Sequence, residues 1–310
     1  MGRKKNTELD FRFCEIPAGS SALVLPEEPW EDAYGPHEES LHFHNLFELG
    51  CCRSGSGRLI LGGEELPYEG AVLSAAPANC PHSSLRESGE AWEYVYFEPR
   101  ELIREIFPDN PIHQELMFVT AANQPLLLRA EEHPELAGYL ERLLWESWEK
   151  RRYSQELIRG LLKLCLLELI RIQEGRKSLD PGAERSHELQ LHITPALRYI
   201  EEHCDRNLRV SDLARECGLS EPHFRRLFAQ SMNMPPLEYL NLARVRLGCK
   251  LISTKEIPMD LLAAECGFSS TSAFTRNFKK FLGTTPYQWK LQRERRGFGD
   301  GAIGFPPHQD

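Results

Sequence analysis

The sequence lacks a long apolar run, a C-x-x-C pair and an excess of positive charge. No stretch of its 310 residues is apolar enough to span a bilayer, and residues 1–7 have no apolar core of a signal peptide. These absences argue against a membrane protein, so we expect a cytoplasmic protein with no membrane partner. The nine cysteines lie mostly in apolar runs, which predicts reduced, buried thiols rather than a disulfide framework.

Charge is distributed unevenly along the chain. The net charge of −9 argues against nucleic-acid binding when it is averaged over all residues. Within residues 186–297, however, Lys and Arg outnumber Asp and Glu by 17 to 12, although they are outnumbered by 37 to 46 in the whole chain. A basic C-terminal part beside an acidic remainder is typical of a DNA-binding domain attached to a regulatory domain. The length allows two or three domains with proper cores.

A short pattern occurs twice between residues 211 and 286. In both copies Gly follows Ala by four residues, and two Phe four residues apart precede a Pro by eight residues. The first copy consists of Leu213, Ala214, Gly218, Phe224, Phe228 and Pro236, and the second of Leu262, Ala263, Gly267, Phe274, Phe278 and Pro286. A repeat of this regularity predicts two structural units of the same kind.

Each copy predicts a helix, a tight turn and a second helix. Gly218 and Gly267 suit the left-handed position that ends a helix, and Ser220 and Ser269 suit the cap of the next one. The Phe pair forms an apolar stripe on the second helix, which leaves the polar residues between them free to meet bases and phosphates. Two ordinary helical hairpins with solvated charges are the alternative.

The repeat and the residues around it resemble the AraC/XylS family of bacterial transcription regulators over about residues 190–293. The resemblance is carried by the repeat itself, Tyr239-Leu240, Arg244, the run from Gly267 to Lys280, and Gly283 to Tyr287. In that family a long helix joins two helix-turn-helix units, whose second helices enter successive major grooves. The resemblance implies an all-α DNA-binding domain over residues 189–296, with double-stranded DNA as its partner and RNA polymerase as a second partner of an activator.

Carried over residue by residue, the resemblance implies which side chains contact DNA. They are Pro222, His223, Arg225 and Arg226 in the first unit, Arg244 between the units, and Thr271, Ser272, Thr275 and Arg276 in the second. The chain departs from the family at Gly248, where alanine is usual. Glycine there costs about 1 kcal/mol of helix propensity, so we expect a less rigid linker helix. Pro222 suits a first helical turn but offers no side-chain donor.

Residues 11–110 predict a small β-barrel. Short strands are expected at residues 22–25, 47–52, 58–61, 71–75 and 92–97, with glycine-rich turns between several of them. His42 and His44 share one face of an extended strand, so they can meet Glu48 and His82 inside the barrel. The arrangement resembles the cupin family, whose metal-binding members use two histidines and a glutamate from one motif and a histidine from another.

This cluster leaves several interpretations open. Three imidazoles and a carboxylate suit a divalent Zn, Fe, Mn or Ni ion. AraC-like sensor domains often keep much of this pattern while binding a small organic effector. The histidines could also simply form hydrogen bonds at the barrel mouth. A metal-dependent cupin enzyme, such as an oxygenase, isomerase or epimerase, is the competing function, and a regulator with a ligand-free barrel used for oligomerisation is a third.

Residues 111–175 predict a helical linker or dimerisation region. Two amphipathic helices are expected with a break near residues 151–154. The second is apolar around most of its circumference, which favours packing on both the barrel and another subunit; a purely intramolecular layer is the alternative. Residues 176–188 predict a polar linker, residues 1–10 an N-terminal tail and residues 297–310 a disordered tail.

Together these patterns predict a multi-domain α and β protein. An N-terminal cupin-like barrel is followed by helices and by a C-terminal all-α double helix-turn-helix domain. The predicted function is a cytoplasmic, homodimeric transcription regulator, not an enzyme, in which a small effector or metal in the barrel favours one arrangement of the domains and so alters DNA binding.

Overall fold

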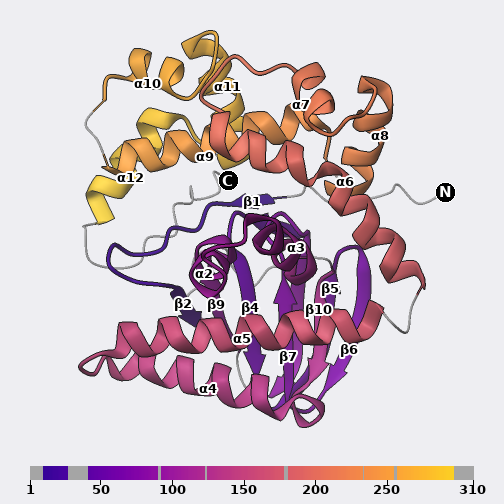
Figure 1. The fold of residues 1–310 in the computed structure, drawn as a ribbon. Helices are drawn as coiled ribbons and strands as arrows, with labels where there is room; N and C mark the ends of the chain where they lie inside the picture. Colours follow the sequence, from indigo (N-terminus) through magenta and orange to yellow (C-terminus); the bar gives the residue numbers. More distant parts are fainter. Residues whose placement is uncertain are drawn as a thin grey trace, which may run out of the picture. The chain divides into compact units, whose positions relative to one another are not determined.

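The computed structural model describes residues 10–26, 41–89, 92–122, 124–177, 181–232, 234–254 and 257–296 (Figure 1). The chain divides into two compact units, with the boundary between Ala183 and Glu184. Within the described ranges, no helix is both long and apolar enough to cross a membrane.

The first unit contains two five-stranded sheets. One has the order β1 (Asp10–Arg12), β3 (His42–His44), β8 (His82–Gly89), β5 (Gly55–Leu61) and β6 (Glu64–Glu69). The other has the order β10 (Leu126–Arg129), β7 (Val72–Ala76), β4 (Phe47–Cys52), β9 (Glu93–Phe97) and β2 (Leu23–Pro26). Neighbouring strands pair antiparallel except β1 and β3, which are parallel.

The predicted closed barrel is not what the structure shows. No strand pair among the described residues joins one sheet to the other, so the unit is a layered pair of sheets. All five strands expected from the sequence are present as β2, β4, β5, β7 and β9, close to their expected bounds. β1, β6, β8 and β10 were not predicted as separate strands, because they are very short or rich in polar residues.

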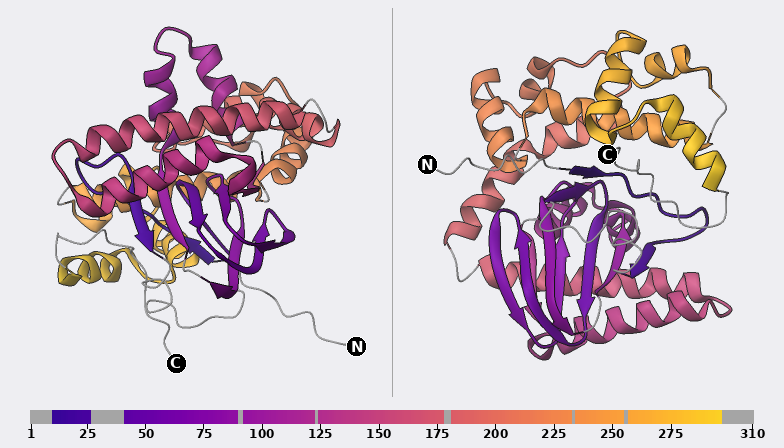
Figure 2. Two further views of the ribbon diagram at one scale, coloured as in Figure 1. Left: turned by 90° about the horizontal axis from the view of Figure 1, so that it is seen from below. Right: turned by 180° about the vertical axis from the view of Figure 1, so that it is seen from behind.

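The sheet that contains β4 buries its two faces differently. Phe47, Leu49 and Cys51 belong to a large apolar core with side chains of α4 (Pro134–Glu149) and α5 (Ser154–Lys177), which run along this sheet (Figures 1 and 2). Glu48 lies between two of these residues, so the two-residue period of a strand turns its side chain to the opposite face, toward the other sheet. The polar site therefore depends on this alternation.

The helices of the first unit partly follow the predicted pattern. α4 and α5 are the two expected helices, and the turn between them uses positive φ at Lys150 (49°) and Tyr153 (66°). The structure adds α2 (Pro99–Ile106), α3 (Pro111–Ala121) and the short η1 (Ala130–Glu132).

The predicted polar linker at 176–188 is largely helical, because α5 continues to Lys177 and α6 (Pro181–His203) begins four residues later. Apart from Asp10, where β1 begins, the expected tails at residues 1–10 and 297–310 lie outside the described residues.

The second unit contains the two expected helix-turn-helix units. The first is α7 (Val210–Glu216) and α8 (Glu221–Met232), and the second is α10 (Met259–Glu265) and α11 (Thr271–Leu282). The long helix α9 (Pro236–Thr254) joins them, and α12 (Pro286–Arg296) follows, as Figures 1 and 2 show. The predicted all-α double helix-turn-helix architecture is confirmed.

The two turns are built alike. Gly218 and Gly267 have φ of 65° and 78°, the left-handed values that glycine tolerates. The next N–H, of Leu219 or Phe268, donates to a carbonyl five residues earlier at 3.0 Å in both copies, which closes a Schellman motif. The predicted helix cap at Ser269 is wrong by one residue, because the longer second turn places Ser270 there.

The aromatic repeat forms the core of each helix-turn-helix unit. Phe224 and Phe228 have ring centroids 5.4 Å apart, and Phe274 and Phe278 repeat this distance. Gly248 of α9 lies against this core, because an added β-carbon would be 2.9 Å from Cε2 of Phe274. The glycine that the sequence associated with a less rigid helix therefore permits close contact between α9 and α11.

Candidate DNA-binding surface and buried polar site

α8 presents the predicted contact residues on its exposed side. Phe224 and Phe228 are buried, whereas Pro222, His223, Arg225 and Arg226 are exposed. Arg225 donates to the Glu221 carboxylate at 2.7 Å, an ion pair within the helix surface. Arg226 has no hydrogen bond or ion pair with any described residue. Arg226 can therefore bind a partner without first breaking an ion pair, whereas Arg225 would have to leave Glu221.

α11 presents a similar face. Thr271, Ser272 and Arg276 are exposed and Thr275 is half-buried, while Phe274 points into the core. The sequence interpretation missed Lys279, which is exposed three residues after Arg276 and so lies on the same side of the helix. The signal was in the sequence, since both lysines of the Lys279-Lys280 pair follow the aromatic stripe. Lys280 instead pairs with Glu238 of α9 at 2.7 Å.

Arg244 does not lie on this surface. Its side chain is 7% exposed, its Nε donates to the Cys204 carbonyl at 2.9 Å, and its Nη2 donates to the Arg206 carbonyl at 2.8 Å. The guanidinium also lies 5.6 Å from the ring centroid of Phe268, and burial lowers its pKa. Arg244 was predicted to contact DNA, but in the structure it is buried. Its hydrogen bonds connect α9 to the segment that follows α6.

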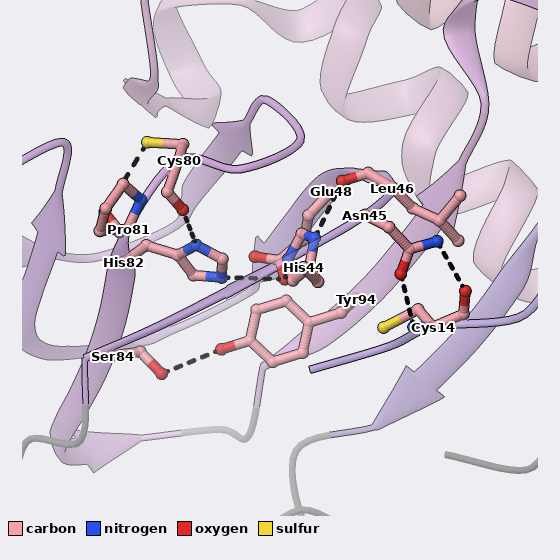
Figure 3. Close-up of polar contacts among 10 residues, drawn as sticks. All are labelled: Cys14, His44, Asn45, Leu46, Glu48, Cys80, Pro81, His82, Ser84 and Tyr94. Carbon is pink, nitrogen blue, oxygen red and sulfur yellow. Dashed lines mark hydrogen bonds and ion pairs between the residues drawn. The ribbon is translucent and has the colours of Figure 1, made fainter. Parts of the chain in front are cut away.

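The first unit brings His44, Glu48 and His82 together between the sheets (Figure 3). These residues come from β3, β4 and β8, and all three are buried. Nε2 of His44 is 3.0 Å from Oε2 of Glu48, and Nε2 of His82 is 3.4 Å from the same oxygen. His42 lies outside this group, although its ring centroid is 4.4 Å from that of His82.

Backbone carbonyls fix the tautomers of the two histidines. Nδ1 of His44 lies 2.8 Å from the Leu46 carbonyl, and Nδ1 of His82 lies 2.8 Å from the Cys80 carbonyl. A carbonyl only accepts, so each Nδ1 donates, and in a neutral ring Nε2 carries a lone pair. Both Nε2 lone pairs then face the Glu48 carboxylate, which when ionised can also only accept hydrogen bonds. This arrangement calls for a proton or a cation between the groups.

Burial and charge affect the pKa values in this cluster. Burial lowers the pKa of His44, and it also lowers the pKa of His42, helped by the nearby Arg12. Burial alone would raise the pKa of Glu48, but its interactions with His82 and His44 hold that pKa well below its usual value. Burial and the Glu48 carboxylate raise the pKa of Tyr96. An ionised carboxylate thus lies beside His44, whose charged form burial disfavours.

A cavity of about 70 Å³ adjoins the cluster. Its wall includes Glu48, His82 and His42 but also residues that the sequence interpretation missed. These are Arg12, Leu59, Leu61, Ser74, Ser83 and Ser84, which line the cavity together with Tyr94 and Tyr96. In the sequence, these residues are marked only by the alternation of inward and outward side chains along each strand. That pattern does not show which strands face each other.

Comparison with known proteins agrees with the architecture of the second unit. A family model described as a helix-turn-helix domain matches residues 213–292. The chain is 25% identical to the arabinose operon regulatory protein of Escherichia coli (strain K12) over 239 residues, which covers 76% of each protein. It is 28% identical to the melibiose operon regulatory protein of the same strain over 271 residues, covering 82% of this chain and 85% of the relative.

A solved structure also matches the C-terminal part. The DNA-binding domain of AdpA in complex with a target DNA is 27% identical, with a TM-score of 0.33, and the match covers 34% of this chain and 94% of that one. The family model and the relatives that match most of the chain confirm the resemblance that the sequence predicted: the chain is similar to AraC-type transcription regulators and has a C-terminal helix-turn-helix domain like theirs.

Proposed function

We propose that α8 and α11 read a specific operator in successive major grooves, and that a ligand in the buried polar site modulates this binding. The observation that supports the DNA-binding role is the repeated geometry: in each unit the aromatic core turns polar and cationic side chains to the exposed face of the second helix. Such a regulator acts in the cytoplasm, and an activator of this kind also contacts RNA polymerase. The first unit serves binding rather than catalysis.

Arg226 and Arg276 are the proposed base-reading residues. Both are exposed, and neither guanidinium forms a hydrogen bond or ion pair with another described residue. An arginine bound to guanine through two hydrogen bonds contributes about 1–3 kcal/mol of discrimination. Pro222, His223, Arg225, Thr271, Ser272 and Thr275 contribute backbone contacts or contacts to neighbouring bases.

The test is fluorescence anisotropy of the full-length protein on DNA from its own upstream region and on scrambled DNA of equal length, across a salt series. The proposal expects strong preference for the native sequence, and a loss of about 1–3 kcal/mol with relaxed preference at one base for Arg226→Ala or Arg276→Ala. Arg171→Ala, an exposed arginine of α5, is the matched control for loss of charge. Equal weakening on every sequence would refute base reading.

The His44, Glu48 and His82 group is proposed to bind a divalent metal ion. Adjacent ligands of a tetrahedral ion with bonds of about 2.0–2.1 Å lie roughly 3.3 Å apart, close to the 3.0 and 3.4 Å that separate Glu48 from the two histidines. Nε2 of His82 is buried without a hydrogen bond, as a nitrogen awaiting a ligand would be. Backbone bonds at both Nδ1 atoms orient the rings in the way that metal sites require.

Elemental analysis of purified protein tests this proposal. We expect stoichiometric Zn, Fe, Mn or Ni, lost in Glu48→Gln and retained in Glu65→Gln, a carboxylate on the exposed strand β6. If the protein is folded but contains no metal after growth with each of these metals, the metal proposal is wrong. An organic effector is then the remaining ligand for this site. Turnover of a substrate by the metal-loaded protein would instead support the enzyme alternative.

Dimerisation through α5 is also proposed. Leu157 and Leu164 are 47% and 41% exposed, and Leu161 between them is half-buried. Their spacing of four and three residues forms one apolar stripe, which suits a second copy of the helix. Sedimentation should therefore give a dimer that Leu157→Lys with Leu164→Lys converts to a monomer. An unchanged dimer would place the interface elsewhere.

A further inference from the structure

Arg12 brings a buried positive charge to the cavity beside the histidine cluster. It lies on the three-residue strand β1, whose parallel pairing places it opposite His44 of β3. Its side chain is 7% exposed, and it lines the cavity together with Glu48 and His82. Arg12 already has a partner within the protein, but a guanidinium has five N–H donors and no acceptor, so it can also donate to a ligand in the cavity.

The rest of the wall is also suited to a polar ligand. Hydroxyl groups come from Ser74, Ser83, Ser84, Tyr94 and Tyr96, and Ser84 and Tyr94 already share a hydrogen bond of 3.1 Å (Figure 3). Most of the cavity wall is nevertheless apolar, and Leu59 and Leu61 contribute to that part of it. The Glu48 carboxylate also faces the cavity, but it lies 3.0 Å from Nε2 of His44 and 3.4 Å from Nε2 of His82, so it is engaged within the cluster.

The size of the cavity limits the ligand. A cavity of about 150 Å³ holds one benzene molecule. The cavity of about 70 Å³ is about half that size and therefore holds on the order of three or four non-hydrogen atoms without rearrangement. This is too small to enclose a hexose or an aromatic acid, but it suits the carboxylate end of a small acid.

We propose that the cavity binds a small carboxylate, held through its charge by Arg12, with the hydroxyl groups binding the remaining oxygens. Carboxylates are the natural partners of guanidinium because two parallel N–H···O bonds form at once. The inference deepens the proposed function, since this carboxylate is the effector. Its binding site uses residues of the first unit alone.

Calorimetry on the full-length protein tests the ligand class. The probes are acetate, glycolate, lactate and pyruvate, with lactamide as a neutral match for lactate and benzoate as an oversized acid. We expect at least one small acid to bind, with lactamide and benzoate at least tenfold weaker. Comparable binding of lactamide would overturn the role of charge, and comparable binding of benzoate would overturn the size limit.

Substitutions test the residues. Arg12→Gln should weaken the acid at least tenfold, and Ser84→Ala should weaken it several-fold with little risk to folding. Arg58→Gln removes a partly exposed arginine of β5 that pairs with Glu65, and it should change nothing. If EDTA abolishes binding while Arg12→Gln and Ser84→Ala leave it intact, the acid is held by a metal alone and the inference is wrong.

DNA binding separates the two proposals. If no probe acid binds a folded protein that still prefers its operator, the carboxylate inference fails and the DNA-binding proposal stands. If an acid binds through Arg12 but leaves operator affinity unchanged, the carboxylate site stands and the proposed link to DNA fails.

Discussion

Replacing Gly248 with alanine tests how α9 packs against the second helix-turn-helix unit. An ideal β-carbon at Gly248 would lie 2.9 Å from Cε2 and 3.0 Å from Cζ of Phe274, and 3.4 Å from Sγ of Cys266. Phe274 is 1% exposed, so its ring has little room to move away. Helix propensity alone favours alanine over glycine by about 1 kcal/mol. Packing and propensity therefore act in opposite directions at this position.

The expected net effect follows from these two contributions. Overpacking a well-filled core costs about 1–3 kcal/mol, so Gly248→Ala should destabilise the second unit by about 0–2 kcal/mol after the propensity gain. Gly160→Ala in α5 is the matched control, because that glycine is exposed and no other atom lies within 4 Å of its added β-carbon. The control should stabilise the first unit by roughly 1 kcal/mol.

Urea unfolding followed by circular dichroism, with a separate fit for each unit, measures both effects. A double-mutant cycle with Phe274→Leu isolates the steric term, because the smaller side chain should make Gly248→Ala less costly or favourable. A gain for Gly248→Ala equal to that of Gly160→Ala, or a coupling energy of zero with Phe274→Leu, would show that α9 and Phe274 are not in close contact.

Two other predictions concern the same unit. Gly267→Ala should destabilise it more than Gly218→Ala in urea unfolding: both positions have positive φ, which costs alanine about 1–2 kcal/mol, but only a β-carbon at Gly267 would overlap the Cys204 carbonyl. Equal costs would contradict the difference in packing. Arg244→Met should cost about 2–4 kcal/mol of stability through two lost charge-assisted hydrogen bonds, with the preference for operator over scrambled DNA unchanged. If Arg244→Met relaxed the preference at one base, Arg244 would contact DNA after all, and the interior role would be wrong.

The helix-turn-helix units were predictable because their determinants are local. A left-handed glycine, a small residue four positions earlier and an aromatic pair at helical spacing all act within one short segment, and the structure repeats each of them at Gly218 and Gly267. β4 was predicted from its apolar residues Phe47, Leu49, Cys51 and Cys52. β6 and β8 were not assigned, because their exposed polar residues match a loop as well as an edge strand.

The polar site was only partly predictable. Strand alternation was enough to suggest that His44, Glu48 and His82 converge. Arg12 was missed because its position depends on the parallel pairing of β1 with β3, a long-range contact with no local pattern. Arg244 was assigned to DNA because its partners are the carbonyls of Cys204 and Arg206, and a backbone acceptor has no signature in the sequence.

Coupling between the cavity and DNA must be reciprocal if the small acid is an effector. A ligand shifts DNA affinity only through a difference in its own affinity for the free and DNA-bound protein, typically by about 5–150-fold. An acid that changes the operator Kd tenfold must therefore have its own Kd changed tenfold, in the same direction, by saturating operator DNA. Titrating the acid into protein with and without operator measures this factor, and Arg12→Gln should remove both effects together.

The control for this linkage is sodium chloride at the ionic strength of the acid, because salt alone weakens binding to phosphates. Suppose that the acid changes operator affinity beyond this control while operator DNA leaves the affinity for the acid unchanged. Equilibrium linkage forbids that result for one molecule binding both ligands, so the acid would be acting at a site other than the cavity lined by Arg12.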